Sequence, residues 1–214
     1  MLWMEPAGET FIRAVEPDDL ASTRRWRNDP AVAAPALGRR FPITVGGEQQ
    51  WFDNLGVGQF PTHVVWAVAN AESSIVGLVQ LYDIDWIHRT ASFGIWIGPE
   101  HWNLGHGSRA TQLAVEHGLR DLDLRQIRLS VLSDSEAALR TYKKVGFVEE
   151  GVQRGAVLVG GQTVDLVLMC IDRELGSRGT QLRVRRRIDR MIAPSVSSAD
   201  EAATAQVVRR RGLT

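Results

Sequence analysis

The sequence lacks several features that identify common classes of protein. Its single cysteine, Cys170, excludes a disulfide within the chain, and the apolar run around this residue predicts a role in core packing. The five histidines do not have the spacing of metal ligands, so we predict no metal site. The G-x-S-x-G motif of serine hydrolases is also missing.

Long apolar runs are missing as well. No stretch of about 18 apolar residues is present, so the sequence predicts no membrane span. The first ten residues have neither a basic start nor an apolar run, and we therefore predict no signal peptide. Together these features predict a cytoplasmic protein.

Net charge is zero over the whole chain, but it is unevenly distributed. From Arg173 onward ten basic residues stand against four acidic ones, so this tail carries +6 and residues 1–172 carry −6. A basic tail can bind nucleic acid, but a charge run is more often a solvated surface, and no aromatic residues alternate with these arginines. We therefore do not expect nucleic acid as a partner.

Apolar residues, by contrast, are plentiful. They make up 44% of the 214 residues and include seven tryptophans, which is enough for the sizeable core of one domain. We predict one domain over residues 1–175, followed by a basic C-terminal extension over residues 176–214 that is partly helical or disordered.

Hydrophobic periodicity predicts the order of the elements. A short strand at Thr10–Val15 precedes a helix that begins at Glu16-Pro17-Asp18-Asp19, where proline and acidic residues suit a first turn. A long proline-bearing loop over 31–44 separates this helix from a second one. The remaining predictions are a helix at Gly47–Leu55, strands at His63–Ala69, Ile75–Tyr82 and Thr90–Ile97, a helix at Gly107–Asp121, a strand at Gln126–Leu132, a helix at Glu136–Val145, and a hairpin of Phe147–Leu158 and Thr163–Ile171.

The junction between Thr90–Ile97 and the helix that follows is the most informative stretch. Here a strand breaks at Gly98-Pro99 and continues through a glycine-bearing loop into a helix. Glycines let a backbone approach an anion, and the N–H groups at a helix start point the same way, so this pattern suits phosphate binding. The same letters also suit a structural turn in which Ser108 serves as a cap.

Two motifs together resemble those of the GCN5-related N-acetyltransferases (GNAT), in particular the branch that acetylates ribosomal proteins and amino sugars. The first, Trp102-Asn103-Leu104-Gly105-His106-Gly107, is similar to the family's pyrophosphate loop, with tryptophan where glutamine or arginine is common. The second is Ser135-Glu136-Ala137-Ala138-Leu139-Arg140-Thr141-Tyr142-Lys143-Lys144-Val145-Gly146-Phe147, with Ser135 where asparagine is usual. The resemblance covers about residues 10–172.

This resemblance implies an α/β fold with a central mixed, mostly antiparallel sheet of about seven strands, flanked by about four helices and splayed at the cofactor cleft. It implies acetyl-CoA as the cofactor, with its diphosphate on the loop and its pantetheine arm along the open edge of the Thr90–Ile97 strand. The residues implied in cofactor binding are Trp96, Ile97, Trp102, Asn103, Leu104, Gly105, His106, Gly107, Ser108, Arg109, Ser135, Ala138 and Tyr142.

Tyr142 is the expected general acid, because a phenol stays protonated at neutral pH and can supply a proton to a departing thiolate. The general base stays open. Family members often carry a glutamate early in the strand before the loop, where this chain has Ala91-Ser92-Phe93. Asp83, Asp85 and His88 in the preceding turn are candidates, although each could equally be a solvated turn residue.

The predicted function is transfer of an acetyl group from acetyl-CoA to a primary amine of a small molecule such as an amino sugar or antibiotic. Two alternatives are a protein N-terminal acetyltransferase of the ribosomal-protein type and a non-catalytic acyl-CoA-binding module. We expect a monomer or homodimer. The residues expected to contact the acceptor amine are Trp26, Arg27, Asn28 and Trp86.

Overall fold

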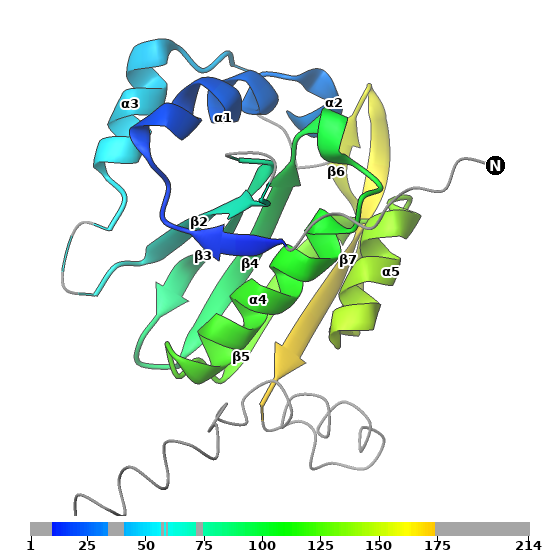
Figure 1. Cartoon of the computed structure of the whole chain (residues 1–214). Coiled ribbons are helices and arrows are strands. Elements are labelled where there is room, and N and C mark those ends of the chain that lie inside the picture. The colour runs from blue at the N-terminus through cyan, green and yellow to red at the C-terminus, as the bar shows by residue number, and fades with distance from the viewer. Residues whose placement is uncertain (1–9, 34–40, 57, 59, 72–74, 174–214) are drawn as a thin grey trace, which may run out of the picture.

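The computed structural model describes residues 10–33, 41–56, 58, 60–71 and 75–173. The predicted C-terminal extension over residues 176–214 lies outside the described residues. The chain folds in the predicted order of strands and helices around one sheet (Figure 1).

The sheet has seven strands in the order β1-β2-β3-β4-β5-β7-β6, and every neighbouring pair is antiparallel except β4 and β5. The predicted mixed, mostly antiparallel sheet is therefore confirmed. The strands are β1 (Phe11–Arg13), β2 (His63–Ala69), β3 (Gly77–Asp85), β4 (Thr90–Ile97), β5 (Gln126–Leu132), β6 (Val148–Val159) and β7 (Gln162–Asp172).

The parallel pair is the irregular part of the sheet. Strands β4 and β5 pair only from Thr90 opposite Gln126 to Ser92 opposite Arg128. Strand β4 then continues for five more residues to Ile97, still paired with β3 on its other side. The two strands therefore diverge beyond Ser92, and the edge of β4 that faces β5 is open there.

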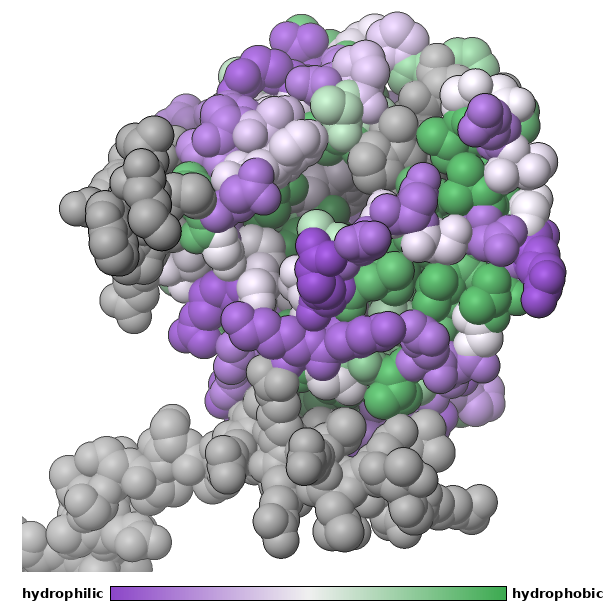
Figure 2. All heavy atoms as spheres, turned by 90° about the vertical axis from the view of Figure 1, so that its right-hand side faces the viewer, coloured by the Kyte–Doolittle hydropathy of each residue, from purple (hydrophilic) through white to green (hydrophobic). Residues whose placement is uncertain are grey.

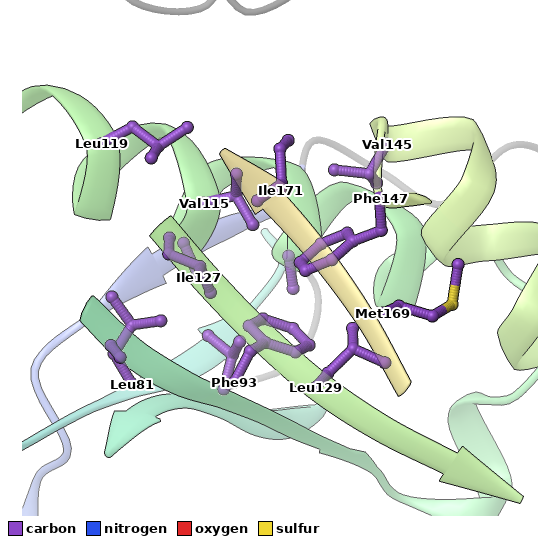
Figure 3. Close-up of a cluster of buried hydrophobic side chains, with 14 of the residues drawn as sticks. Leu81, Phe93, Val115, Leu119, Ile127, Leu129, Val145, Phe147, Met169 and Ile171 are labelled. Carbon is purple, nitrogen blue, oxygen red and sulfur yellow. The ribbon is translucent and has the colours of Figure 1, made fainter. Parts of the chain in front are cut away.

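Helices α4 (His106–Arg120) and α5 (Glu136–Val145) cover one face of the sheet (Figure 1). In the main core, side chains of the inner strands meet side chains of both helices (Figure 3). The strands contribute Leu81, Phe93, Ile127 and Leu129, and the helices contribute Val115, Leu119 and Val145. Helix α4 lies very close to the sheet, because a Cβ atom at Gly118 would stand 2.8 Å from both Ile127 Cδ1 and Leu81 Cδ1. This contact holds the C-terminal part of α4 against β3 and β5.

A second, smaller core lies on the other face. Helices α1 (Leu20–Arg27) and α3 (Val45–Asp53) contribute Trp26, Trp51 and Phe52 to it, and the sheet contributes Leu78 and Trp96. Inside this layer the Arg27 guanidinium pairs with Glu48 at 2.9 Å and stacks on the Trp51 ring at 4.6 Å. The layer joins α1 to α3.

The N-terminal elements differ in detail from the prediction. Asp19 accepts from the Glu16 backbone N–H at 2.8 Å and binds the Arg13 guanidinium at 2.7 and 2.9 Å, so residues Pro17–Asp19 form a 3-10 turn before α1 begins. A short helix, α2 (Pro30–Ala33), occupies the start of the predicted long loop. The backbone N–H of Ala31 donates to Asp29 Oδ1 at 2.8 Å, which satisfies a donor of its first turn.

Two further differences concern strand ends. Strand β3 extends beyond the predicted end at Tyr82 to Asp85, because a bulge with Asp83 at φ 49° carries the pairing on to Thr90. Strand β6 forms the outer edge of the sheet, and its Val152 and Leu158 are exposed. Figure 2 shows this side of the molecule, with hydrophobic areas between hydrophilic ones. Among the described helices, none is long and apolar enough to cross a membrane.

Candidate active site

The divergence of β4 and β5 opens a cavity of about 860 Å³ on the side of the sheet that carries α4 and α5. Its walls are Ile95, Trp96 and Ile97 of β4 and Ser130 and Val131 of β5. The starts of α4 and α5 close its two ends. The cavity thus combines an open strand edge with the N-terminus of a 15-residue helix.

The loop between β4 and α4 is shaped by backbone conformations that bring its amides to the cavity. Asn103 and Gly105 have φ values of 61° and 86°, and Gly105 is the residue that precedes α4. The first intrahelical bond of α4 runs from the Arg109 N–H to the Gly105 carbonyl at 3.1 Å. The N–H groups of the first helical residues, His106 to Ser108, are therefore left to face an anion.

His106 is buried and lines the cavity. Its Nδ1 lies 2.9 Å from Thr10 Oγ1, whereas its buried Nε2 has no hydrogen-bond partner among the described residues. Burial, with a smaller contribution from His101, lowers the pKa of His106, so the ring is neutral at physiological pH. An unpaired buried ring nitrogen is costly, and a ligand group in the cavity would satisfy it.

The open edge of β4 is already engaged at one point. The Gly98 N–H donates to the Val76 carbonyl at 2.9 Å. In an antiparallel pair successive residues alternate in direction, so the backbone N–H and C=O of the preceding residue, Ile97, point away from β3. The indole N–H of Trp102 donates to the Ile97 carbonyl at 2.7 Å. Trp102 is 43% exposed and lines the cavity, so its ring can move when an extended ligand pairs with β4.

Tyr142 reaches the cavity from α5 and packs edge-on against Phe93 of β4 with ring centroids 6.0 Å apart. Burial, and to a smaller extent Tyr82 nearby, raises the pKa of the Tyr142 phenol to about 12. The hydroxyl is therefore protonated at neutral pH and can donate. Ser135 stands at the start of α5 and lines the same cavity, and its hydroxyl makes no capping bond to the helix.

Comparison with known proteins places this geometry in a family. The family model described as "Acetyltransferase (GNAT) domain" matches residues 10–148. The chain belongs to the GNAT acetyltransferases. This is the family of acetyl-CoA-dependent N-acetyltransferases that the two motifs predicted.

Individual relatives are similar over different lengths. Spermidine N(1)-acetyltransferase of Escherichia coli (strain K12) is 36% identical over 104 residues, 49% of this chain and 56% of that protein, so the chain spans about half the length of this curated relative. L-amino acid N-acetyltransferase AaaT of the same organism is 27% identical over 164 residues, 75% of this chain and 96% of that protein. The crystal structure of spermidine N-acetyltransferase from Vibrio cholerae in complex with CoA and spermine superposes with a TM-score of 0.69 at 26% identity, covering 76% of this chain and 95% of that one.

Most residues expected to bind the cofactor line the cavity of this GNAT domain. Leu104 and Arg109 are the two that do not. Those that do are Trp96, Ile97, Trp102, Asn103, Gly105, His106, Gly107, Ser108, Ser135, Ala138 and Tyr142. The cavity is also lined by residues outside the two motifs, such as Val32 of α2 and Ser130 of β5. These were not predicted, because no local sequence pattern marks them.

The residues expected as general base lie at the other end of β4. Asp85 and His88 form an exposed ion pair at 2.7 Å in the turn before Thr90, and Asp83 occupies the exposed bulge of β3. The cavity begins at Ile95, about 16 Å along the strand from Thr90. The structure therefore does not bring these three side chains to the cavity.

The residues expected to contact the acceptor have other contacts in the structure. Trp26 is buried, and its indole N–H donates to both carboxylate oxygens of Glu100 at 3.1 Å. Arg27 is buried against Glu48, and Asn28 exchanges hydrogen bonds of 2.9 and 2.7 Å with the backbone of Ile43. Trp86 lies in the turn before β4 and donates to the Pro61 carbonyl at 3.1 Å. None of these four side chains lines the cavity.

Proposed function

We propose that this protein transfers an acetyl group from acetyl-CoA to a primary amine of a small molecule. The observation that carries the proposal is the single cavity that joins three parts: the open edge of β4, the amide-lined start of α4, and the protonated Tyr142. Each part suits one portion of the cofactor. The family of the chain and the CoA-bound structure of its Vibrio cholerae neighbour support the same reading.

The start of α4 is suited to the diphosphate of the cofactor. The N–H groups of His106, Gly107 and Ser108 offer hydrogen bonds without a cationic side chain, and the helix dipole favours an anion there. Gly107 leaves room for it, because a Cβ atom at this position would meet only Ile97 Cγ1, at 3.6 Å. A proton on the unpaired His106 Nε2 would add a further donor to this end of the cavity.

The open edge of β4 suits the peptide-like pantetheine arm, which can pair with the strand where β5 has diverged. The arm would start beside Ile97, at the diphosphate end, and a backbone N–H further back along this edge, nearer the apex of the split, would polarise the thioester carbonyl in the manner of an oxyanion hole. The Trp102 indole, which occupies the Ile97 carbonyl, would have to yield that acceptor to the arm.

Acetyl-CoA supplies a thioester: the amine nitrogen bonds to the acetyl carbon as the carbon–sulfur bond breaks and the sulfur leaves with the electron pair. Tyr142 would give its proton to that sulfur and would then regain a proton from solvent; a pKa of about 12 keeps the phenol protonated at neutral pH, so that the proton is present when the sulfur leaves. The amine loses its own proton to solvent. The Escherichia coli and Vibrio cholerae relatives are named for a polyamine acceptor, and they give no support to the predicted amino sugar or antibiotic.

The test is acetyl-CoA turnover followed by release of free thiol in the presence of a panel of amines, with calorimetric measurement of CoA binding. We expect turnover with at least one amine and CoA binding at one site per chain. Gly107→Val should fold normally and lose CoA affinity at least tenfold, since its side chain enters the space at the start of α4. Gly46→Val, an exposed position in α3 with nothing near its Cβ, is the control. Unchanged CoA affinity in Gly107→Val would contradict the assignment of this loop.

A further inference from the structure

On the face of the sheet opposite α4 and α5, polar side chains gather where β4 and β5 begin to part. They belong to two rows of residues that run across neighbouring strands, and we call these two rows the acceptor floor. The first row is His63, Tyr82, Ser92 and Arg128, which are successive pairing partners, and the second is Val65, Gln80 and Gly94. The residues between them in the strands, such as Leu81 and Phe93, belong to the core under α4 and α5, so the floor faces the other way.

The floor lies next to the reacting end of the cavity. If the diphosphate lies at the start of α4, the pantetheine arm runs back along β4 from Ile97 toward Gly94, so its thioester comes to the apex of the split. Ser92 is the last residue of β4 that pairs with β5. Because α4 and α5 cover the cofactor side, an amine must reach this apex from the acceptor floor.

Gln80 holds the central position on the floor and is fixed in orientation. Its Oε1 lies 2.6 Å from His63 Nε2, and since this oxygen can only accept, the imidazole nitrogen donates. The His63 ring is in turn held edge-on to Tyr82, with centroids 6.2 Å apart. The Gln80 amide nitrogen therefore lies over Gly94, 2.9 Å from the place that a Cβ atom would occupy. A hydrogen-bond donor thus stands directly above β4 at the apex.

The other polar groups of the two rows are the hydroxyls of Tyr82 and Ser92, which can both donate and accept, and the cationic Arg128. Burial raises the pKa of Tyr82, with a further contribution from Asp83, so its phenol keeps its proton, while a hydrogen bond with Ser92 acts in the opposite direction. Arg128 is half exposed and makes one ion pair, 3.7 Å from Nε to Glu150. Neither row contains a carboxylate. Two acids flank the rows: Asp83 in the exposed bulge, which acts on Tyr82, and Glu150, which Arg128 neutralises in part.

We propose that the acceptor floor selects amines that carry a hydroxyl, carbonyl or carboxylate oxygen close to the amino group, and that it disfavours polyamines. This inference rests on the proposed function. An oxygen near the amine accepts hydrogen bonds from Gln80 and Arg128. A polyamine presents a second ammonium at the same place, where it meets the Gln80 amide donor and the positive charge of Arg128 and finds no carboxylate in either row. Discrimination of this kind is large when buried polar groups are left unpaired.

The experiment compares two acceptors of equal length, 3-aminopropan-1-ol and 1,3-diaminopropane, with glucosamine and spermidine as a larger pair. Acetylation is followed as kcat/KM at pH 7.5. We expect the parent protein to prefer the oxygen-bearing member of each pair by at least tenfold. Gln80→Glu keeps an acceptor for His63 but places a carboxylate over Gly94, so the preference should fall at least tenfold and turn toward the diamine. Gln50→Glu adds the same charge at an exposed site on α3 and should leave the preference unchanged.

Ser92→Asp is a second route to the same change, because it brings a carboxylate to the other row beside the apex. A parent protein that prefers spermidine would overturn the inference and leave the proposed function intact. So would an unchanged preference in both Gln80→Glu and Ser92→Asp when circular dichroism shows them folded. Absence of turnover with every amine would overturn the proposed function and this inference with it.

Discussion

Tyr142 and Tyr82 are the only tyrosines of the chain, and they lie near each other at the apex of the split sheet. Burial raises the pKa of both phenols and keeps them protonated, and the pKa of Tyr142 reaches about 12. Their roles differ by position. Tyr142 lines the cofactor cavity, whereas Tyr82 belongs to the opposite face of the sheet.

Tyr142→Phe should lower kcat by about 100-fold or more, since general acid catalysis contributes about 10²–10⁴ to a rate. The ring contacts with Phe93 and Phe147 survive in this variant, so folding and CoA affinity should be unchanged. Because the acid form persists below its pKa of about 12, the parent should show no loss of kcat from this group between pH 7 and 10. Steady-state rates and calorimetry check both statements, and equal kcat in variant and parent would remove Tyr142 from the mechanism.

Sequence alone was sufficient for some residues of the site and insufficient for others. Gly105, Gly107 and Tyr142 stand in two motifs with strong local spacing, and they meet in one cavity. The candidates for the general base, such as Asp85 and His88, lie close in sequence to the start of β4. Closeness in sequence does not give closeness to the cavity, because a few residues of an extended strand span more than 10 Å.

At the scale of elements, α1 and the loop before α4 are joined through Trp26. Its indole donates to Glu100, which Arg25 also binds, and its ring lies under Gly98, where β4 ends. A Cβ atom at Gly98 would stand 2.4 Å from Trp26 Cε2. The glycine is therefore needed so that α1 can pack closely against the start of the cofactor loop.

Gly98→Ala should destabilise the fold by about 1–3 kcal/mol, the usual cost of adding a methyl group to a filled core. The matched substitution Gly46→Ala lies in α3, where nothing is within 4 Å of the new atom. It should stabilise by about 0.5–1 kcal/mol, since alanine suits a helix interior better than glycine. Urea unfolding monitored by circular dichroism measures both changes, and equal effects of the two substitutions would refute the close packing at Gly98.

The order of the elements was predictable because hydrophobic periodicity and the glycines at helix ends are local signals. Helix α5 is an example: it begins after Ser135 and is followed by Gly146, which has φ 124°. The details that failed depend on tertiary partners. The 3-10 turn at Pro17–Asp19 follows from the contacts of Asp19 with Arg13, and the extension of β3 to Asp85 follows from its pairing with Thr90. The members of each pair lie close in sequence, but no recognisable spacing pattern marks their contact.

At the scale of the whole molecule, the two parts of the chain carry opposite net charge: residues 1–172 carry −6 and residues 173–214 carry +6. The described core, cavity and acceptor floor all lie between residues 10 and 173, in the part of the chain that carries the negative balance. The last described contacts of this part tie Arg173 to Asp123 at 2.6 Å and its N–H to the Arg125 carbonyl at 2.9 Å. The domain boundary at residue 175 remains a prediction, which a truncated chain tests.

A chain ending at Leu175 should fold and bind CoA with the affinity of the full chain, because it retains every described residue of the cavity and of the core. Its net charge falls to about −6, since residues 176–214 carry nine of the basic residues and three of the acidic ones. The isoelectric point should therefore drop well below 7. Calorimetry with CoA, thermal unfolding and isoelectric focusing together check the expectation, with Arg173→Gln in the full chain as a control for the loss of the Asp123 contact. A truncated chain that unfolds, or that loses CoA affinity tenfold while Arg173→Gln does not, would mean that residues 176–214 are part of the domain.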